Sequence, residues 1–391
     1  MKASPLKLCL PVIILSTQYA VVTFIIPPFL ESLKYPLSAI GSLISVGPIL
    51  ALCARLPAGL IYKGERARSL LVGTLLIIVI SNFLYGVAVK PLYFALVHAV
   101  NGFALGAATT IYLAFYVESL PAGENRHHAM GYYVGALAAG YSSGSFMGGF
   151  VGDRFGHIAT FDFGALLALS CFPILFYLKW RPASPGKREL QERRSPGVFD
   201  SLKNTLNPKI AAVMIVALFL NIIHQMGSVF LPLYGLAVGL SLTQIGVIKG
   251  LYALCNAITR PLSGLVVQRL SSRFLSPTLL PLQALSMTLI PFFNHFSSLL
   301  VIYVLGGFLR AIGIVSNTIS MVEDVDERRV RRGIASGVFN AAGDIGNILG
   351  PSLGGLIASF VGVAGLFLTG PPIIAGLFLI SLWGCRFIKE F

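Results

Sequence analysis

The sequence predicts an all-α membrane protein with twelve transmembrane helices, arranged as two parallel-repeat halves of six helices around a central cavity. Its 391 residues are 55% hydrophobic and only 11% charged, whereas soluble domains average about 25% charged residues. Such a chain has too little polar surface to cover a water-soluble globule. Twelve apolar segments also approach the about 20 residues that a helix needs to cross a bilayer, and the last six echo the first six.

The twelve apolar segments follow one another along the chain, centred near residues 21, 50, 78, 104, 139, 168, 222, 254, 284, 310, 346 and 375. The first begins like a signal peptide, but its apolar run continues to Ile26, beyond the about 7–15 residues of a signal core. A basic stretch rich in Pro and Ser interrupts the series. We therefore expect a six-helix half over residues 1–180, a cytoplasmic linker over 181–208 and a second half over 209–391.

Residues on the two sides of this linker match in order, at an offset of 205 or 206 positions. Arg55 with Gly59 matches Arg260 with Gly264. Glycines repeat every fourth residue in both halves, at Gly140, Gly144 and Gly148 and at Gly346, Gly350 and Gly354. Such glycines share one helix face and allow close backbone approach, either as static packing or as a contact that slides. Because six is an even number, both halves have the same orientation, as in a parallel repeat.

The net charge of +14 is explained by topology rather than by a nucleic-acid partner. If the N-terminus is cytoplasmic, the loops on the far side of the membrane contain only Lys34, Lys90 and Arg154, and most other Lys and Arg are cytoplasmic. We therefore expect both termini in the cytoplasm and a multi-pass protein of the plasma membrane, most simply a bacterial inner membrane. The basic linker is expected to contact anionic lipids.

A loop motif identifies a family resemblance. The stretch RLPAGLIYKGERAR, residues 55–68, follows the second apolar segment. It resembles the motif G-x-x-x-D-R-x-G-R-R between the second and third helices of the major facilitator superfamily. Gly59, Arg66 and Arg68 are in place, and Lys63 stands where the motif has an acid.

The glycines of the fifth segment resemble a second motif of that superfamily, one associated with antiporters. Its usual proline is Ser145 here, while the second half keeps Pro351. The resemblance covers nearly the whole chain. It implies a secondary transporter of the drug and metabolite efflux branch, whose first, fourth, seventh and tenth helices line the central cavity.

Ionisable side chains in apolar segments are the first candidates for function, because burying them in a membrane is costly and requires a partner. Asp344 lies near the midpoint of the eleventh segment and Arg310 near that of the tenth. A pair with Arg310 is one candidate explanation for Asp344. Asp344 would then serve proton or substrate transfer or fix the helix packing, and the alternative is a lipid-facing position. His224 in the seventh segment is a second proton-coupling candidate, and a hydrogen-bonded structural histidine is the alternative.

Other polar side chains at membrane depth are candidates for the substrate cavity. The planar guanidinium of Arg310 matches the geometry of a carboxylate or phosphate. Arg310 and Lys249 are two basic groups against the single acid Asp344, which favours an anionic or neutral solute. The remaining candidates are Gln18, Tyr19, Asn101, Tyr112, Asn221, Gln225 and Asn340. Arg55 and Arg260 occupy matching places near helix ends, and we interpret both as structural.

Together with the resemblance, these residues predict a secondary active transporter that moves a small organic solute by alternating access. We expect proton-coupled efflux, and a proton symporter that takes up an organic anion is the alternative. The sequence has neither a nucleotide loop of the type G-x-x-x-x-G-K-[ST] nor metal-ligand spacing, so we expect no enzyme, no cofactor and no metal. We expect the protein to act as a monomer.

Overall fold

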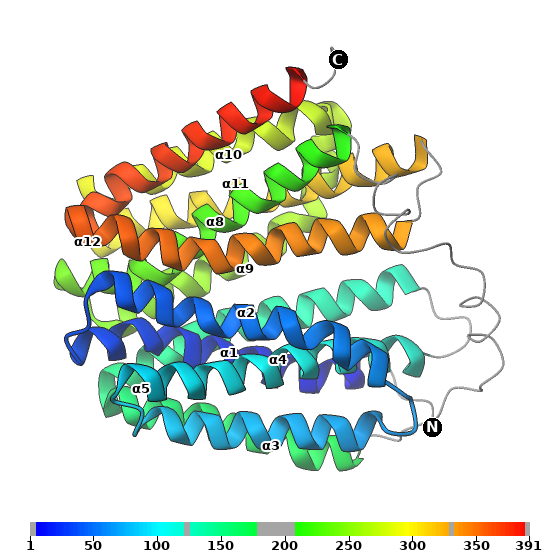
Figure 1. Cartoon of the computed structure of the whole chain (residues 1–391), viewed down its shortest axis with the longest axis vertical. Coiled ribbons are helices and arrows are strands. Elements are labelled where there is room, and N and C mark those ends of the chain that lie inside the picture. Colours follow the sequence, from blue (N-terminus) through cyan, green and yellow to red (C-terminus); the bar gives the residue numbers. More distant parts are fainter. Residues whose placement is uncertain (1–4, 121–125, 178–207, 328–331, 388–391) are drawn as a thin grey trace. The chain divides into compact units, whose positions relative to one another are not determined.

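A computed structural model describes residues 5–120, 126–177, 208–327 and 332–387, and within these ranges the chain is helical, without strands (Figure 1). The predicted all-α class is therefore confirmed. The helices are α1 (Pro5–Ser32), α2 (Leu37–Ile61), α3 (Ala67–Tyr85), α4 (Pro91–Ser119), α5 (Arg126–Tyr177), α8 (Pro208–Ala237), α9 (Leu242–Arg269), α10 (Ser272–Thr288), the 3-10 helix η1 (Ile290–Phe292), α11 (Phe296–Glu327) and α12 (Arg332–Phe387). Nearly all of the predicted linker lies outside the described residues.

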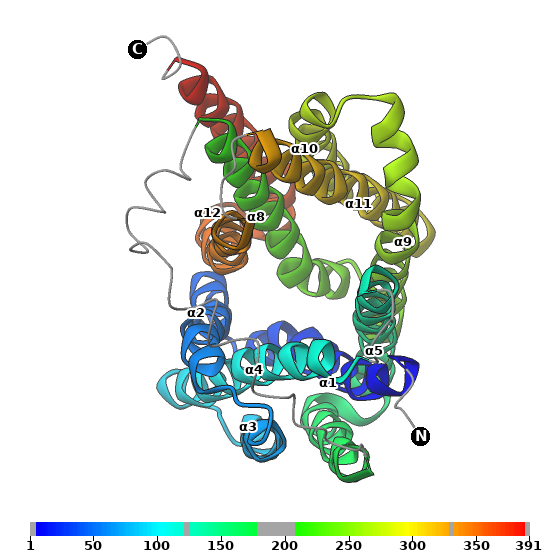
Figure 2. The same cartoon turned by 90° about the vertical axis from the view of Figure 1, so that its right-hand side faces the viewer.

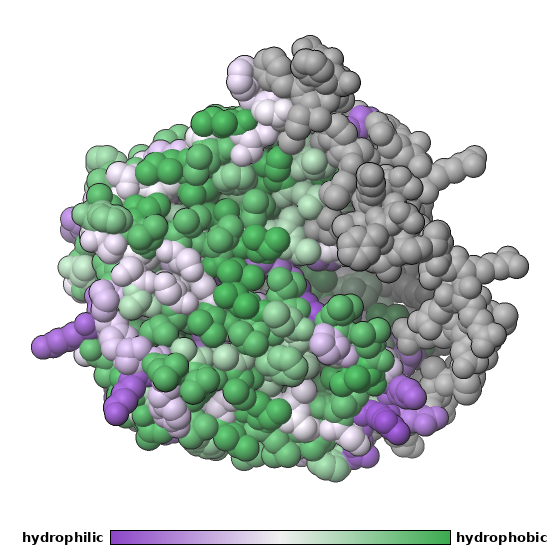
Figure 3. All heavy atoms as spheres, in the orientation of Figure 1, coloured by the Kyte–Doolittle hydropathy of each residue, from purple (hydrophilic) through white to green (hydrophobic). Residues whose placement is uncertain are grey.

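Within the described ranges, nine helices are long and apolar enough to cross a membrane. Hydrophobic residues also dominate the face of the molecule drawn in Figure 3. Two of the nine, α5 and α12, contain 52 and 56 residues, and each is interrupted by a glycine with positive φ, Gly156 at 83° and Gly362 at 74°. An L-residue with a side chain rarely adopts this conformation, which explains why glycine is found at both interruptions.

Packing divides the chain into two compact units. The first contains Met1–Ala183 and Val229–Leu254, and so consists of α1 to α5, the end of α8 and the first half of α9. The second contains Ser184–Ser228 and Cys255–Phe391. The predicted boundaries of the two halves are not tested by this division and stay a prediction.

In the first unit, α1 lies along α5 and α2 lies along α4 (Figure 2). The packing glycines determine how closely α1 and α5 approach. A side chain at Gly140 would collide with Ser16, and one at Gly144 would collide with the backbone carbonyl of Thr17. Small residues at these positions allow the backbones to touch, as in membrane helix pairs that lack a hydrophobic driving force.

The second unit repeats this contact between α8 and α12. A side chain at Gly346 would collide with the Leu218 carbonyl and lie 2.8 Å from Cβ of Asn221, and one at Gly350 would lie 2.8 Å from the Ile222 carbonyl. Asn221 and Ile222 correspond to Ser16 and Thr17 at the offset of 205 positions. The same register of helix packing therefore occurs twice.

A further close contact in the first unit joins α5 to α9. Gly149 faces the Leu242 carbonyl and Gly246, and the Ser142 hydroxyl donates to the Gly250 carbonyl at 2.9 Å. At the end of this contact, the Thr243 hydroxyl donates to Asp153 Oδ2 at 2.7 Å. A helix from the second half of the sequence thus packs against α5 through glycines on both sides.

Candidate functional site

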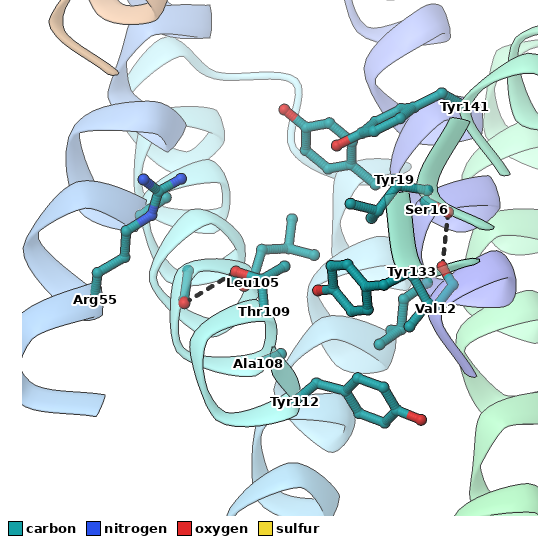
Figure 4. A pocket seen from close by; sticks show the side chains of 14 residues that line it. Val12, Ser16, Tyr19, Arg55, Leu105, Ala108, Thr109, Tyr112, Tyr133 and Tyr141 are labelled. Carbon is teal, nitrogen blue, oxygen red and sulfur yellow. Dashed lines mark hydrogen bonds between the residues drawn. The ribbon is translucent and has the colours of Figure 1, made fainter. Parts of the chain in front are cut away.

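A pocket of about 150 Å³ opens between α1, α2, α4 and α5 in the first unit (Figure 4). Fourteen residues line it, and most are apolar or aromatic. Ligand sites in proteins have this character, with an apolar lining and a few placed polar groups. We therefore take this pocket as the candidate substrate site.

Tyrosines form one wall of the pocket. Tyr19 comes from α1, and Tyr133 and Tyr141 come from α5. The rings of Tyr19 and Tyr141 meet edge to face, with centroids 5.9 Å apart and an interplanar angle of 79°. Because Gly140 and Gly144 bring α1 and α5 into contact, the tyrosines that flank this contact meet beside it.

The opposite wall comes from α2 and α4. A side chain at Gly106 would collide with the backbone of Ala51, so these two helices also touch. Arg55 follows Ala51 by one turn and projects from α2 across the pocket from the tyrosines, with Thr109 of α4 between them (Figure 4). The Arg55 side chain is exposed, whereas Tyr112 is buried and donates its hydroxyl to the Leu8 carbonyl at 2.6 Å.

Of the cavity candidates in the first half of the sequence, Tyr19 and Tyr112 line the pocket. Asn101 and Gln18 are not among the lining residues. Asn101 donates to Oδ1 of Asn82 on α3 at 3.2 Å. Gln18 is fully buried, and neither polar atom of its side chain has a hydrogen-bond partner among the described residues.

In the second unit, the structure brings Arg310 of α11 together with Asn221 of α8. The Arg310 guanidinium donates to Oδ1 of Asn221 and to the Leu220 carbonyl, both at 2.8 Å. Asn221 in turn donates to the Ala217 carbonyl at 2.8 Å. Arg310 is only 7% exposed, so these bonds compensate for the burial of its charge.

The remaining candidates of the second unit lie on α12 and α8. Asp344 is half-buried on α12, directly after Gly343, where a side chain would lie 3.1 Å from Nδ2 of Asn221. Its pairing with Arg310 stays a prediction. His224 and Gln225 are half-buried on α8, with Cβ of Gln225 against the Gly350 position, and Asn340 is exposed on α12.

Lys249 belongs to the first unit, on α9. Its side chain is half-buried, and Nζ lies 5.4 Å from the centroid of the Phe24 ring. This is within the range of a cation–π contact, which partly replaces the water that a lysine loses on burial. Lys249 is not among the residues that line the pocket.

The residues of the loop motif occupy two environments. Gly59, Lys63 and Arg66 are exposed. Arg68 places its guanidinium 4.4 Å from the centroid of the Phe176 ring and donates to the Phe176 carbonyl at 3.3 Å. Arg68 thus connects the start of α3 to the end of α5.

The sequence did not single out Tyr141, and it gave Arg55 a structural role only. The neighbouring residues could have identified Arg55 as a candidate for the pocket. The matching Arg260 donates Nε to Oδ1 of Asn256 one turn earlier, at 3.0 Å, whereas the residue one turn before Arg55 is Ala51. Tyr141 could have been identified from its position next to the packing glycine Gly140, because a side chain there flanks the helix contact.

The described residues contain no cluster of His, Cys, Asp and Glu that could hold a metal ion.

A family model supplies the decisive comparison. The model of the major facilitator superfamily matches residues 8–329 and, in an overlapping second match, residues 237–387. The chain belongs to the major facilitator superfamily. Membership makes it a multi-pass membrane protein and a transporter of small molecules rather than an enzyme.

Solved structures of this superfamily share the fold across nearly their whole length. The nucleoside transporter NupG has a TM-score of 0.76 at 16% identity, covering 99% of each chain. A bacterial homologue of the human lysosomal transporter Spinster, in an inward-facing and unoccupied conformation, has a TM-score of 0.75 at 14% identity. That match covers 97% of this chain and 92% of the other. A search of curated protein sequences gave no match.

Proposed function

We propose that this protein is a twelve-span carrier that exports a small organic solute by alternating access, in exchange for protons. The count of twelve follows if α5 and α12 each cross the membrane twice and α9 crosses once. Two six-helix halves, residues 1–180 and 209–391, would then have the same orientation and both termini in the cytoplasm. We expect this carrier to act as a monomer in a bacterial inner membrane.

The pocket of the first unit is the observation on which this proposal chiefly rests. It combines an apolar, aromatic lining with the guanidinium of Arg55, and it lies on helices that are apolar enough to span a membrane. A site of this kind suits a small organic solute. The lining includes no acidic side chain, which favours an anionic or neutral solute over a cation.

Proton coupling is assigned to Asp344, with His224 as the second candidate. Asp344 is half-buried on α12 and directly follows Gly343, which faces Asn221 of the Arg310 cluster. A carboxylate within a membrane helix is a functional candidate by default, because its charge is costly to maintain there. A carboxyl that gains and loses a proton as its surroundings change would couple transport to the proton gradient.

The direction of transport rests on the glycines of α5, whose spacing resembles the antiporter motif. The second candidate is uptake of an organic anion together with protons. The cationic side chains Arg55, Lys249 and Arg310 support this alternative, because an anion would be attracted by each of them.

The test uses purified protein in liposomes with an imposed pH gradient and a trapped pH-sensitive dye. Pools of organic anions, neutral metabolites and lipophilic cations are screened for solute-induced proton movement. The neutral pool includes nucleosides, since a structural neighbour is a nucleoside transporter. Wild type is compared with Asp344→Asn, and Ser359→Ala, an exposed position on the same helix, serves as the control.

We expect proton flux with the anionic or neutral pool, lost in Asp344→Asn and retained in Ser359→Ala. The sign of the flux distinguishes the two candidate functions, because an exporter and a symporter move protons in opposite directions relative to the solute. Full flux in Asp344→Asn would assign the coupling to another group, and His224→Gln would be tested next. Solute movement that is independent of the pH gradient in wild type would contradict proton coupling altogether.

A further inference from the structure

We infer that the pocket between α1, α2, α4 and α5 binds a carboxylate attached to a single aromatic ring, and that the Arg55 guanidinium binds the carboxylate group. This inference rests on the proposed function only in that the protein binds a small organic solute. It does not depend on proton coupling or on the direction of transport.

The size of the pocket matches about one ring. Its volume is about 150 Å³. An apolar cavity of about 150 Å³ is large enough to hold benzene, whereas pockets for drug-sized ligands have about 300–1,000 Å³. The walls therefore surround about one ring, and a larger compound would extend beyond them.

The walls suit an aromatic ring better than an aliphatic chain. Tyr19, Tyr133 and Tyr141 contribute rings from one side, and Leu105 and Leu137 add apolar surface. The edge-to-face pair of Tyr19 and Tyr141 leaves a corner of two ring surfaces against which a third ring can pack. Ring contacts of this kind stabilise beyond the area that they bury, so a ring gains more here than an alkyl group does.

Arg55 provides the charge that a carboxylate requires. In Figure 4 it projects from α2 on the side of the pocket opposite the tyrosines, so a ring packed on the tyrosines would direct a substituent toward the guanidinium. A guanidinium binds a carboxylate through two parallel hydrogen bonds, which fixes the orientation of the bound molecule. None of the fourteen lining residues is Asp or Glu, so an ammonium group in place of the carboxylate would meet only like charge.

The repeat supplies a comparison that isolates the role of Arg55. Its counterpart Arg260 occupies the same place on α9, but it donates to Asn256 within its own helix at 3.0 Å. Asn256 in turn donates to the Gly307 carbonyl at 3.3 Å, which fixes the acceptor. At the position that corresponds to Asn256, the first half has Ala51, which itself lines the pocket. The two arginines therefore share a sequence motif, and Arg55 lines the pocket described here.

Binding to the detergent-solubilised full chain tests the inference. Affinities for benzoate, 4-hydroxybenzoate and phenylacetate are measured by calorimetry and saturation-transfer NMR, next to benzamide and benzylammonium as the neutral and cationic analogues. We expect saturable binding of at least one acid. Benzamide and benzylammonium should bind about 10- to 100-fold more weakly, the range expected for loss of a charge-assisted hydrogen bond.

Arg55→Gln should weaken acid binding to the level of the amide, and Arg55→Lys should lie between Arg55→Gln and wild type because it keeps the charge without the fork. Arg260→Gln is the matched control and should bind like wild type. Equal affinity for benzoate and benzamide in wild type, which requires no variant, would overturn the role of Arg55. The absence of binding for all three acids would overturn the substrate class.

The outcome can be separated from that of the proposed function. Arg55-dependent acid binding without proton flux in any liposome pool would contradict proton coupling and support this inference. Proton flux with a solute that benzoate does not inhibit would support the proposed function and overturn this inference.

Discussion

At the scale of single residues, the second unit solves the problem of a buried cation by hydrogen bonding. Arg310 is 7% exposed and donates to the side chain of Asn221 and to the Leu220 carbonyl. The general cost of charged and polar groups in a membrane was enough to single out both residues from the sequence. Their contact could not be predicted, because it depends on how α11 approaches α8. Arg55 shows the reverse, since it shares with Arg260 a glycine four residues later, while the residue one turn earlier is Ala51 in place of Asn256.

The bond between Arg310 and Asn221 leads to a prediction about stability. Asn221→Ala removes a side-chain acceptor from a buried guanidinium, which should lower stability by about 1–3 kcal/mol. Arg310→Lys should also destabilise, because a lysine cannot reach both acceptors with a planar fork. Thermal unfolding in detergent measures both changes, with Asn340→Ala as an exposed control that should stay within about 0.5 kcal/mol of wild type. An Asn221→Ala variant as stable as wild type would mean that this bond contributes nothing.

At the scale of helices, glycines determine which pairs of backbones touch. The sequence predicted close packing at Gly140 and Gly144 and at Gly346 and Gly350, because their spacing of four residues puts them on one face. The partner helices could not be predicted from that spacing, since a glycine face does not specify what it contacts. The structure pairs α5 with α1 and α12 with α8, in the same register.

Two glycines of α5 should respond differently to substitution by alanine. A methyl group at Gly144 would collide with the Thr17 carbonyl, which belongs to the backbone and moves little, so Gly144→Ala should destabilise by about 1–3 kcal/mol. At Gly135 nothing described lies within 4 Å, so Gly135→Ala should be neutral or stabilise by up to about 1 kcal/mol through helix propensity. Unfolding temperatures of the two variants, compared with wild type, test this difference. Equal effects would show that the contact of α1 with α5 is looser than described.

The glycines between α5 and α9 allow a test of whether this contact takes part in transport. A side chain at Gly246 would lie 2.7 Å from the Ser145 carbonyl, so Gly246→Leu cannot form the contact without separating the helices. If transport passes through this conformation, flux should fall by about 10-fold or more, since such a clash costs over 1.4 kcal/mol. Gly264→Leu on the same helix meets nothing described within 4 Å and is the control. Normal flux in Gly246→Leu would mean that the contact is dispensable for transport.

At the scale of the whole molecule, the chain length in α5 decides between one membrane crossing and two. The 52 residues of α5 would form a straight helix of about 78 Å at 1.5 Å per residue, while the hydrocarbon core of a bilayer is about 30 Å thick. The non-helical Gly156 lies near the middle of this length. Two crossings that meet at Gly156 therefore agree with the bilayer dimensions, and one crossing does not.

Cysteine labelling tests this topology directly. Phe155, next to Gly156, is 70% exposed, and Arg66 is exposed between α2 and α3. In a background without the five native cysteines, Phe155→Cys should react with a membrane-impermeant maleimide added to intact cells, and Arg66→Cys should react only after the cells are opened. Because the two positions are separated by three crossings under the twelve-span arrangement, they must lie on opposite sides. Labelling of both from the same side would contradict the three crossings between these positions, and with them the crossing assigned to the first part of α5.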